Sequence, residues 1–232
     1  MKIFLDSANI GQVKEANDMG LLDGVTTNPT LVSQEKEDPE VIYSTLCKMV
    51  RGSVSVETTS NNTEEIIRQG HEITKYGKNA TVKVACTREG LKAVKILEDS
   101  GIPCNVTLIF SPTQAFLAAK AGATIISPFI GRLDDISYDG MDLIRTIISM
   151  LNGGHDTPKP YEYLKKTQVL VASIRHPVHV VEAAQAGAQI STMPPKVFDM
   201  LFKHPLTDIG LERFLKDWEL VKARMVQKVI SP

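Results

Sequence analysis

Thr81-Val82-Lys83-Val84-Ala85 decides how the rest of the chain is interpreted, because it places a lysine inside an apolar run with the composition of a strand. Successive side chains of a strand alternate between its two faces, so Lys83 points away from Val82 and Val84. An ammonium group that points into a core costs several kcal/mol unless it is paired or loses its proton. Lys83 is therefore either a water-facing residue of an edge strand or a buried amine suited to Schiff-base chemistry.

Strands and helices alternate on both sides of this stretch. The expected strands cover residues 2–6, 24–28, 53–58, 81–86, 104–110, 124–129, 168–173 and 189–193. Helical patterns between them include residues 63–76, 88–100, 112–121, 139–151 and 177–186. Such alternation favours a parallel sheet, and eight strand–helix units are the number that closes a (β/α)₈ TIM barrel. We expect an α/β protein in which residues 1–232 form a single barrel domain.

Glycines and absent motifs support this architecture. Gly101, Gly122 and Gly187 each stop a predicted helix just before the next strand. Neither G-x-G-x-x-G nor G-x-x-x-x-G-K-[ST] follows any predicted strand, so an open nucleotide-binding sheet is the weaker alternative. Residues 153–161 read as a surface excursion between the sixth and seventh units.

Side-chain parity marks an inner face that is too polar for packing alone. In the first strand Asp6 opposes Ile3 and Leu5. The polar faces of the third and fifth strands carry Ser53, Ser55 and Glu57, and Asn105 and Thr107, respectively. In the seventh strand we expect Leu170 and Ala172 to face outward, and Val171, Ser173 and Arg175 inward. Most of these polar residues lie in the second half of a strand, where barrel enzymes build their sites.

Two arginines follow the sixth and seventh strands, where the guanidinium groups of Arg132 and Arg175 suit a phosphate. Surface salt bridges are the alternative for either one. His176 and His179 are three residues apart, but no third metal ligand is evident, and we expect both to face solvent.

Bulk composition narrows the classes of partner. A formal net charge of −1, with the basic residues scattered, predicts binding to neither nucleic acid nor an acidic membrane surface. Three cysteines without C-x-x-C spacing argue against a zinc motif and favour a reduced, cytoplasmic protein. Residues 207–226 form an amphipathic helix capped by Thr207, which covers either its own barrel or a neighbouring subunit.

Seven motifs together resemble the transaldolases, in particular their small single-barrel subfamily, which includes fructose-6-phosphate aldolase. They are FLDSAN at 4–9, GVTTNP at 24–29, VSVE at 54–57, TREG at 87–90 after Lys83, NVTLIFS at 105–111, ISPFIGR at 126–132 and ASIR at 172–175. The resemblance covers nearly the whole chain, and it favours the buried-amine interpretation of Lys83.

The resemblance implies transfer of a dihydroxyacetone unit from sedoheptulose 7-phosphate to glyceraldehyde 3-phosphate, giving erythrose 4-phosphate and fructose 6-phosphate. By position, Lys83 would be the Schiff-base nucleophile and Asp6 would move the proton during carbon–carbon cleavage. Glu57 and Thr107 would hold the water that serves carbinolamine formation and loss. A free amine at Lys83 requires that Asp6 and Glu57 are not both ionised against it. The reaction needs no metal or organic cofactor.

Substrate contacts are implied in the same way. The resemblance implies that Asn28, Asn105 and Ser127 bind the hydroxyls of the donor fragment. It also implies that Arg132 and Arg175 bind the phosphate and that Ser173 lines the site. Transaldolase members carry Glu and Phe where this chain has Glu57 and Phe129, whereas aldolase members carry Gln and Tyr. Many small members have Lys-Ile-Pro where this chain has Lys83-Val84-Ala85.

Two other functions stay open from the sequence. One is a fructose-6-phosphate aldolase that releases dihydroxyacetone, and the other is a non-catalytic barrel that binds a sugar phosphate. Small members of the family assemble as pentamers or pairs of pentamers, with the C-terminal helix crossing to a neighbour. We therefore expect a homo-oligomer whose other partners are sugar phosphates.

Overall fold

The computed structural model describes residues 1–152 and 166–230, in two compact units, Met1–Phe198 and Asp199–Pro232. The predicted excursion at 153–161 lies outside the described residues. That all 232 residues form one domain stays a prediction.

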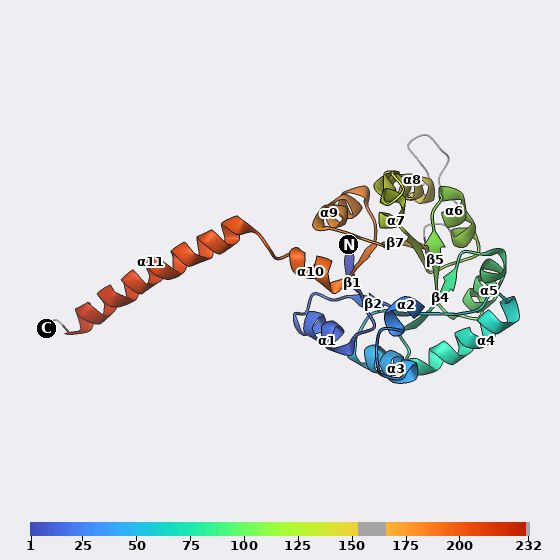
Figure 1. Cartoon of the computed structure of the whole chain (residues 1–232), viewed down its shortest axis with the longest axis horizontal. Helices are drawn as coiled ribbons and strands as arrows, with labels where there is room; N and C mark the ends of the chain where they lie inside the picture. Colours follow the sequence, from blue (N-terminus) through green and yellow to red (C-terminus); the bar gives the residue numbers. More distant parts are fainter. Residues whose placement is uncertain (153–165, 231–232) are drawn as a thin grey trace. The chain divides into compact units, whose positions relative to one another are not determined.

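The first unit is a closed barrel of eight parallel strands, each paired with the next and the last with the first (Figure 1). The strands are β1 (Lys2–Asp6), β2 (Gly24–Thr26), β3 (Val54–Glu57), β4 (Ala80–Ala85), β5 (Cys104–Ile109), β6 (Ile125–Pro128), β7 (Gln168–Val171) and β8 (Ile190–Met193). This confirms the predicted (β/α)₈ fold, because every expected strand is present and the order around the barrel is the order in sequence.

Helices surround the barrel as a ring (Figure 1). They are α1 (Ile10–Asp18), α2 (Pro29–Val32), α3 (Pro39–Met49), α4 (Thr63–Ile73) with η1 (Thr74–Tyr76), α5 (Arg88–Asp99), α6 (Pro112–Lys120), α7 (Gly131–Asp134), α8 (Gly140–Asn152), α9 (Pro177–Ala186) and α10 (Pro195–Met200). The side chains of Asn9, Asn62 and Thr87 each accept a backbone N–H of the first turn, which fixes where the helices after β1, β3 and β4 begin.

β2 ends two residues before the predicted boundary at residue 28, because Asn28 caps α2 instead of continuing the strand. Its Oδ1 accepts the Leu31 N–H at 3.0 Å. Asn28 therefore lies at the carboxyl end of the barrel, between the end of β2 and the first turn of α2.

The inner face of β7 is opposite to the prediction. Leu170 and Ala172 belong to a buried cluster inside the barrel with Phe4, Ile125 and Ile190, whereas Val171 pairs in register with Ser191 and takes the other face. Ser173 nevertheless reaches the inside, because its φ of 62° lies in the left-handed region and ends the alternation of the strand.

The second unit holds one long helix, α11 (Pro205–Ile230), where residues 207–226 were expected. It begins earlier because proline fits the first turn of a helix, where its missing N–H has no partner to lose. Apolar residues recur along it at helical spacing, and Phe214 and Trp218 are exposed. Whether α11 covers a neighbouring subunit stays a prediction. Among the described residues, no helix combines the length and the apolar character of a membrane span.

Candidate active site

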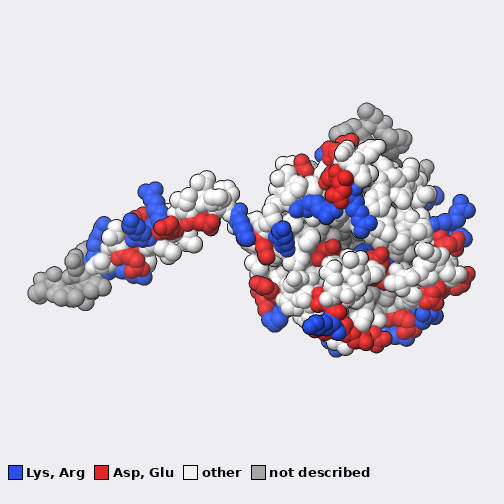
Figure 2. Space-filling view, in the orientation of Figure 1, with Lys and Arg blue, Asp and Glu red and all other residues white. Residues whose placement is uncertain are grey.

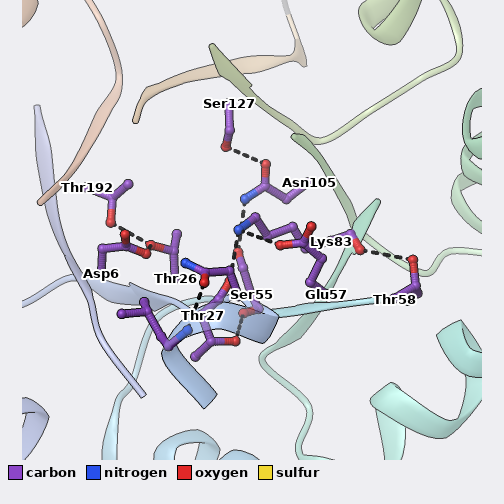
Figure 3. A network of polar contacts seen from close by, with 12 residues as sticks. Asp6, Thr26, Thr27, Ser55, Glu57, Thr58, Lys83, Asn105, Ser127 and Thr192 are labelled. Atoms are coloured by element: carbon purple, nitrogen blue, oxygen red, sulfur yellow. Dashed lines mark hydrogen bonds and ion pairs between the residues drawn. The ribbon is translucent and has the colours of Figure 1, made fainter. Parts of the chain in front are cut away.

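Lys83 lies in the wall of the barrel between β3 and β5, and it is only 4% exposed. Its Nζ lies 2.9 Å from Glu57 Oε2 and donates to the Thr27 carbonyl oxygen at 2.8 Å (Figure 3). A closed barrel has no edge strand, so the water-facing interpretation of Lys83 is wrong.

Glu57 is brought to Lys83 by strand register. The two residues are partners across β3 and β4, so their side chains leave the sheet on the same side. The Glu57 side chain is 13% exposed, and water screens the pair poorly at this burial. A carboxylate oxygen at hydrogen-bonding distance from an amine can accept its proton.

Asp6, at the end of β1, is the second carboxyl near Lys83. The Thr26 hydroxyl donates to Asp6 Oδ1 at 2.7 Å, and it lies 2.7 Å from the Thr192 hydroxyl. A hydroxyl has one proton to give, so Thr192 donates to Thr26. Burial raises the pKa of Asp6 above its ordinary value, and the Lys83 charge and the Thr26 hydrogen bond only partly oppose this rise. Glu57, whose Oε2 lies 2.9 Å from Lys83 Nζ, is the carboxyl in ion-pair contact with the lysine.

A buried chain of hydrogen bonds runs behind Lys83 (Figure 3). The Ser127 hydroxyl donates to Asn105 Oδ1 at 2.6 Å, and Asn105 Nδ2 donates to Ser55 Oγ at 3.1 Å. This chain fixes the plane of the Asn105 amide, whose side chain is fully buried.

Thr107 is positioned by an irregularity in β5. The register between β5 and β6 shifts between Val106 and Ile109, and Leu108 has a φ of 58°. Thr107 Oγ1 is buried and has no hydrogen-bond partner among the described residues. An unpaired buried hydroxyl costs about 1–3 kcal/mol, and because Thr107 lines the cavity, its hydroxyl is accessible to a hydrogen bond with a bound molecule.

A cavity of about 180 Å³ opens at the carboxyl ends of the strands. Its lining includes the predicted site residues Asp6, Asn28, Lys83, Thr107, Ser127, Phe129, Arg132, Ser173 and Arg175. Glu57 and Asn105, also predicted, do not line it but bond to residues that do. The lining is polar on most sides, which suits a small hydroxylated ligand better than an apolar one.

Arg132 and Arg175 stand at one rim of the cavity, and Figure 2 shows basic side chains beside the hollow in the barrel face. The Arg132 Cζ lies 5.0 Å from the centroid of the Phe129 ring, so the guanidinium rests on the ring face. Arg175 Nη2 donates to Asp135 Oδ2 at 2.8 Å, and its side chain is 51% exposed. Exposure leaves Arg175 able to contact a ligand anion.

Four residues of this region escaped the sequence-based predictions. Thr26 and Thr192 support Asp6 and lie near the ends of β2 and β8, and Thr26 also falls within the GVTTNP motif. Thr27 acts through its backbone carbonyl, which no residue type reveals. His179 is 7% exposed, so the expectation that it faces solvent is wrong, whereas His176 is exposed as predicted.

Sequence comparisons link the chain to one family of known proteins. The sequence pattern of the family described as Transaldolase/Fructose-6-phosphate aldolase matches residues 3–231. A protein named "Probable transaldolase" from Nitrosopumilus maritimus is 55% identical over 223 residues, which cover 96% of this chain and 97% of the relative. Another with that name, from Aquifex aeolicus, is 55% identical over 221 residues, covering 95% of this chain and 98% of the relative.

Among solved structures, a thiamine phosphate pyrophosphorylase from Pyrococcus furiosus superposes with a TM-score of 0.54 at 13% identity. The superposition covers 83% of this chain and 85% of the other, and it shows a shared fold alone. The match over almost the full length, together with the identity to the two relatives, shows that this chain belongs to the transaldolase/fructose-6-phosphate aldolase family.

Proposed function

We propose that the protein is a transaldolase that moves a dihydroxyacetone unit from sedoheptulose 7-phosphate to glyceraldehyde 3-phosphate through a Schiff base on Lys83. The products are erythrose 4-phosphate and fructose 6-phosphate. The observation that carries the proposal is the buried Lys83, in contact with Glu57 and lining a polar cavity. Binding alone would need the arginines but not a nucleophile with a proton acceptor beside it.

The first stage forms the covalent bond. Glu57 accepts a proton from Lys83, and the free amine attacks the ketose carbonyl carbon to form a carbinolamine. The hydroxyl of the carbinolamine then leaves as water, with its proton supplied by Glu57, and an iminium remains. Thr107, whose hydroxyl has no partner among the residues that the structure describes, holds the departing water.

The second stage breaks the carbon–carbon bond. Asp6 takes the proton of the hydroxyl two carbons beyond the iminium carbon, and that carbon becomes the aldehyde of the released product. The electron pair of the broken bond moves into the iminium, which becomes a neutral enamine. The raised pKa of Asp6 makes it a stronger base than an ordinary carboxylate, so it is better matched to an alcohol proton. The acceptor aldehyde then enters, and the same steps run in reverse.

The substrate is held at both ends. Asn28 and Ser127, which line the cavity, bind the hydroxyls of the dihydroxyacetone unit, with the Asn28 amide Nδ2 as donor because its Oδ1 caps α2. Asn105 acts from behind the wall, where its Oδ1 accepts from Ser127. Arg132 and Arg175, at the rim, bind the phosphate of the remaining fragment. Ser173 lines the wall between them, and Phe129 supports Arg132. Self-association through α11 belongs to the same proposal.

Borohydride trapping tests the covalent step. Reduction in the presence of fructose 6-phosphate should fix a dihydroxyacetone adduct on the peptide that contains Lys83. Lys78 and Lys92 are the internal comparison, and an adduct on either of them, or on no lysine, would disprove the Schiff-base role of Lys83.

A second measurement separates transfer from cleavage on one preparation. Transfer from fructose 6-phosphate to erythrose 4-phosphate is compared with release of free dihydroxyacetone from fructose 6-phosphate alone. Release as fast as transfer would make the protein a fructose-6-phosphate aldolase.

A further inference from the structure

His179 is a buried histidine next to Arg175, and the proposed reaction gives it no role. It lies in the first turn of α9, four residues after Arg175. The backbone N–H of Arg175 donates to His179 Nδ1 at 3.3 Å, and His179 Nε2 lies 3.3 Å from Asp134 Oδ2. Because Nδ1 accepts, the single proton of the neutral ring is on Nε2, which donates to Asp134.

Asp134 connects this ring to the other arginine. It is the last residue of α7, the short helix that carries Arg132. Its second oxygen, Oδ1, accepts the Gly140 N–H at 2.9 Å, so the carboxylate is held from both sides. The next residue, Asp135, accepts from the Arg175 guanidinium. Asp134 and Asp135, at the end of α7, therefore connect the helix that carries Arg132 to the segment that carries Arg175.

The segments are also in tight contact near the barrel. Ile130 N–H donates to the Ala172 carbonyl, and Gly131 N–H to the Ser173 carbonyl, both at 3.1 Å. A Cβ built on Gly131 would lie 2.3 Å from the Ser173 carbonyl oxygen and 2.4 Å from Arg175 Nε. Arg175 therefore lies directly against the start of α7, and a small movement of its backbone would displace its guanidinium.

We propose that His179 is a positioning residue for the phosphate site: its Nδ1 holds the backbone of Arg175, and its Nε2–H holds Asp134 and with it the helix of Arg132. The inference rests on the proposed function, in which these two arginines bind the substrate phosphate.

The surroundings of His179 favour the neutral ring that this role requires. Burial lowers the pKa of His179, and the charges of His176 and Arg175 lower it further, against Asp134 and Glu182, which raise it. The ring of His176 lies 3.7 Å away between centroids. Protonation would place an N–H of His179 against the N–H of Arg175, and that hydrogen bond would be lost. Phosphate affinity should therefore fall as the pH drops through the pKa of His179.

Two substitutions separate the contacts of the ring. The Oδ1 of asparagine can replace Nδ1 as the acceptor for Arg175, and the Nε2 of glutamine can replace the donor to Asp134. His179→Gln should raise the KM for fructose 6-phosphate and the Ki for inorganic phosphate by about 3- to 10-fold, the loss expected for one hydrogen bond. His179→Asn should stay closer to wild type in both constants. The kcat, and the phosphate-free transfer from fructose to erythrose, should change less than twofold, about the precision of such kinetics.

Controls distinguish this inference from the proposed function. His71→Gln replaces an exposed histidine of α4 and should alter nothing. Arg175→Ala is the reference for loss of phosphate binding, and equal losses with phosphorylated and phosphate-free substrates would overturn the phosphate site and the inference together. If Arg175→Ala discriminates but His179→Gln does not, only the positioning role is refuted. A loss common to all substrates in His179→Gln would also refute it.

The pH dependence gives an independent readout. The ratio of the wild-type KM for fructose 6-phosphate to that of His179→Asn should rise on acidification, because only the wild type loses its acceptor. Titration of the sugar phosphate itself affects both proteins and cancels in the ratio. A ratio that is flat between neutral and acidic pH would contradict the role of Nδ1.

Discussion

Lys83→Met tests how strongly the buried ion pair governs stability. The change keeps the length of the side chain but removes the ammonium that lies 2.9 Å from Glu57, in a pair that is 5% and 13% exposed. Removing one partner of a buried pair typically costs about 3–5 kcal/mol, because the other charge stays buried without compensation. For a domain of this size that corresponds to a fall in Tm of about 6–20 °C.

The double variant Lys83→Met/Glu57→Gln isolates the cause. Glutamine is nearly isosteric with glutamate and removes the uncompensated charge, so the double variant should recover at least half of the lost Tm. Thermal unfolding followed by circular dichroism measures all variants at one protein concentration, since assembly makes Tm depend on concentration. Lys92→Met, which removes an exposed partner of Glu89 at the same kind of distance, is the control and should have little effect.

The outcome that would refute this reasoning is a Lys83→Met protein as stable as the wild type. Such a result would mean that Glu57 reaches water or another donor when Lys83 is absent. A double variant less stable than Lys83→Met would instead show that packing, and not charge, causes the loss. All Lys83 variants should lose transferase activity, including Lys83→Arg, whose guanidinium stays protonated at working pH.

Three other variants extend the tests. Asp6→Asn should abolish turnover and raise Tm at neutral pH. A carboxyl with a raised pKa binds its proton more tightly in the folded protein, so its contribution to stability falls as the pH rises. The gain in Tm of the variant over wild type should therefore shrink on acidification. An Asp6→Asn protein less stable than wild type at neutral pH would contradict this sign. Phe129→Tyr places a proton donor near the enamine, where one can contribute about 10²–10⁴-fold, so release of dihydroxyacetone should rise relative to transfer; a fall in both activities together would identify Phe129 as a packing residue. Trp218, the single tryptophan, should emit at shorter wavelength when subunits associate, and Trp218→Asp should lower the mass measured by light scattering; an unchanged mass would exclude this face of α11 from assembly.

The sequence was most informative where local pattern and global fold agree. The alternation around Lys83, Glu57 and Asp6 placed each on the inner face, because period-two side chains in a closed barrel have only two directions to take. The same logic failed at β7, where pairing with β8 decides the inner face and Ser173 leaves the strand with a positive φ. The residue-by-residue pairing of two strands is not visible in the local pattern of either one.

The groups that hold the site residues in place were harder to predict from the sequence than the site residues themselves. The Thr27 carbonyl that accepts from Lys83 belongs to the backbone, and residue type carries no information about it. His179 was expected in solvent because its helix position alone cannot show that the turn after β6 folds over it. Asn105 was predicted at the cavity but lies behind its wall, held by Ser55 and Ser127.

The cross-strand pairing of Glu57 with Lys83 has a consequence for how the protein becomes active. A slip of one residue between β3 and β4 would turn one of the two side chains to the outer face, and neither Glu57 nor Lys83 would then have its partner. Asp6 comes from β1, which pairs with β2 on one side and with β8, where the barrel closes, on the other. We therefore expect activity to depend on the in-register pairing of β3 with β4.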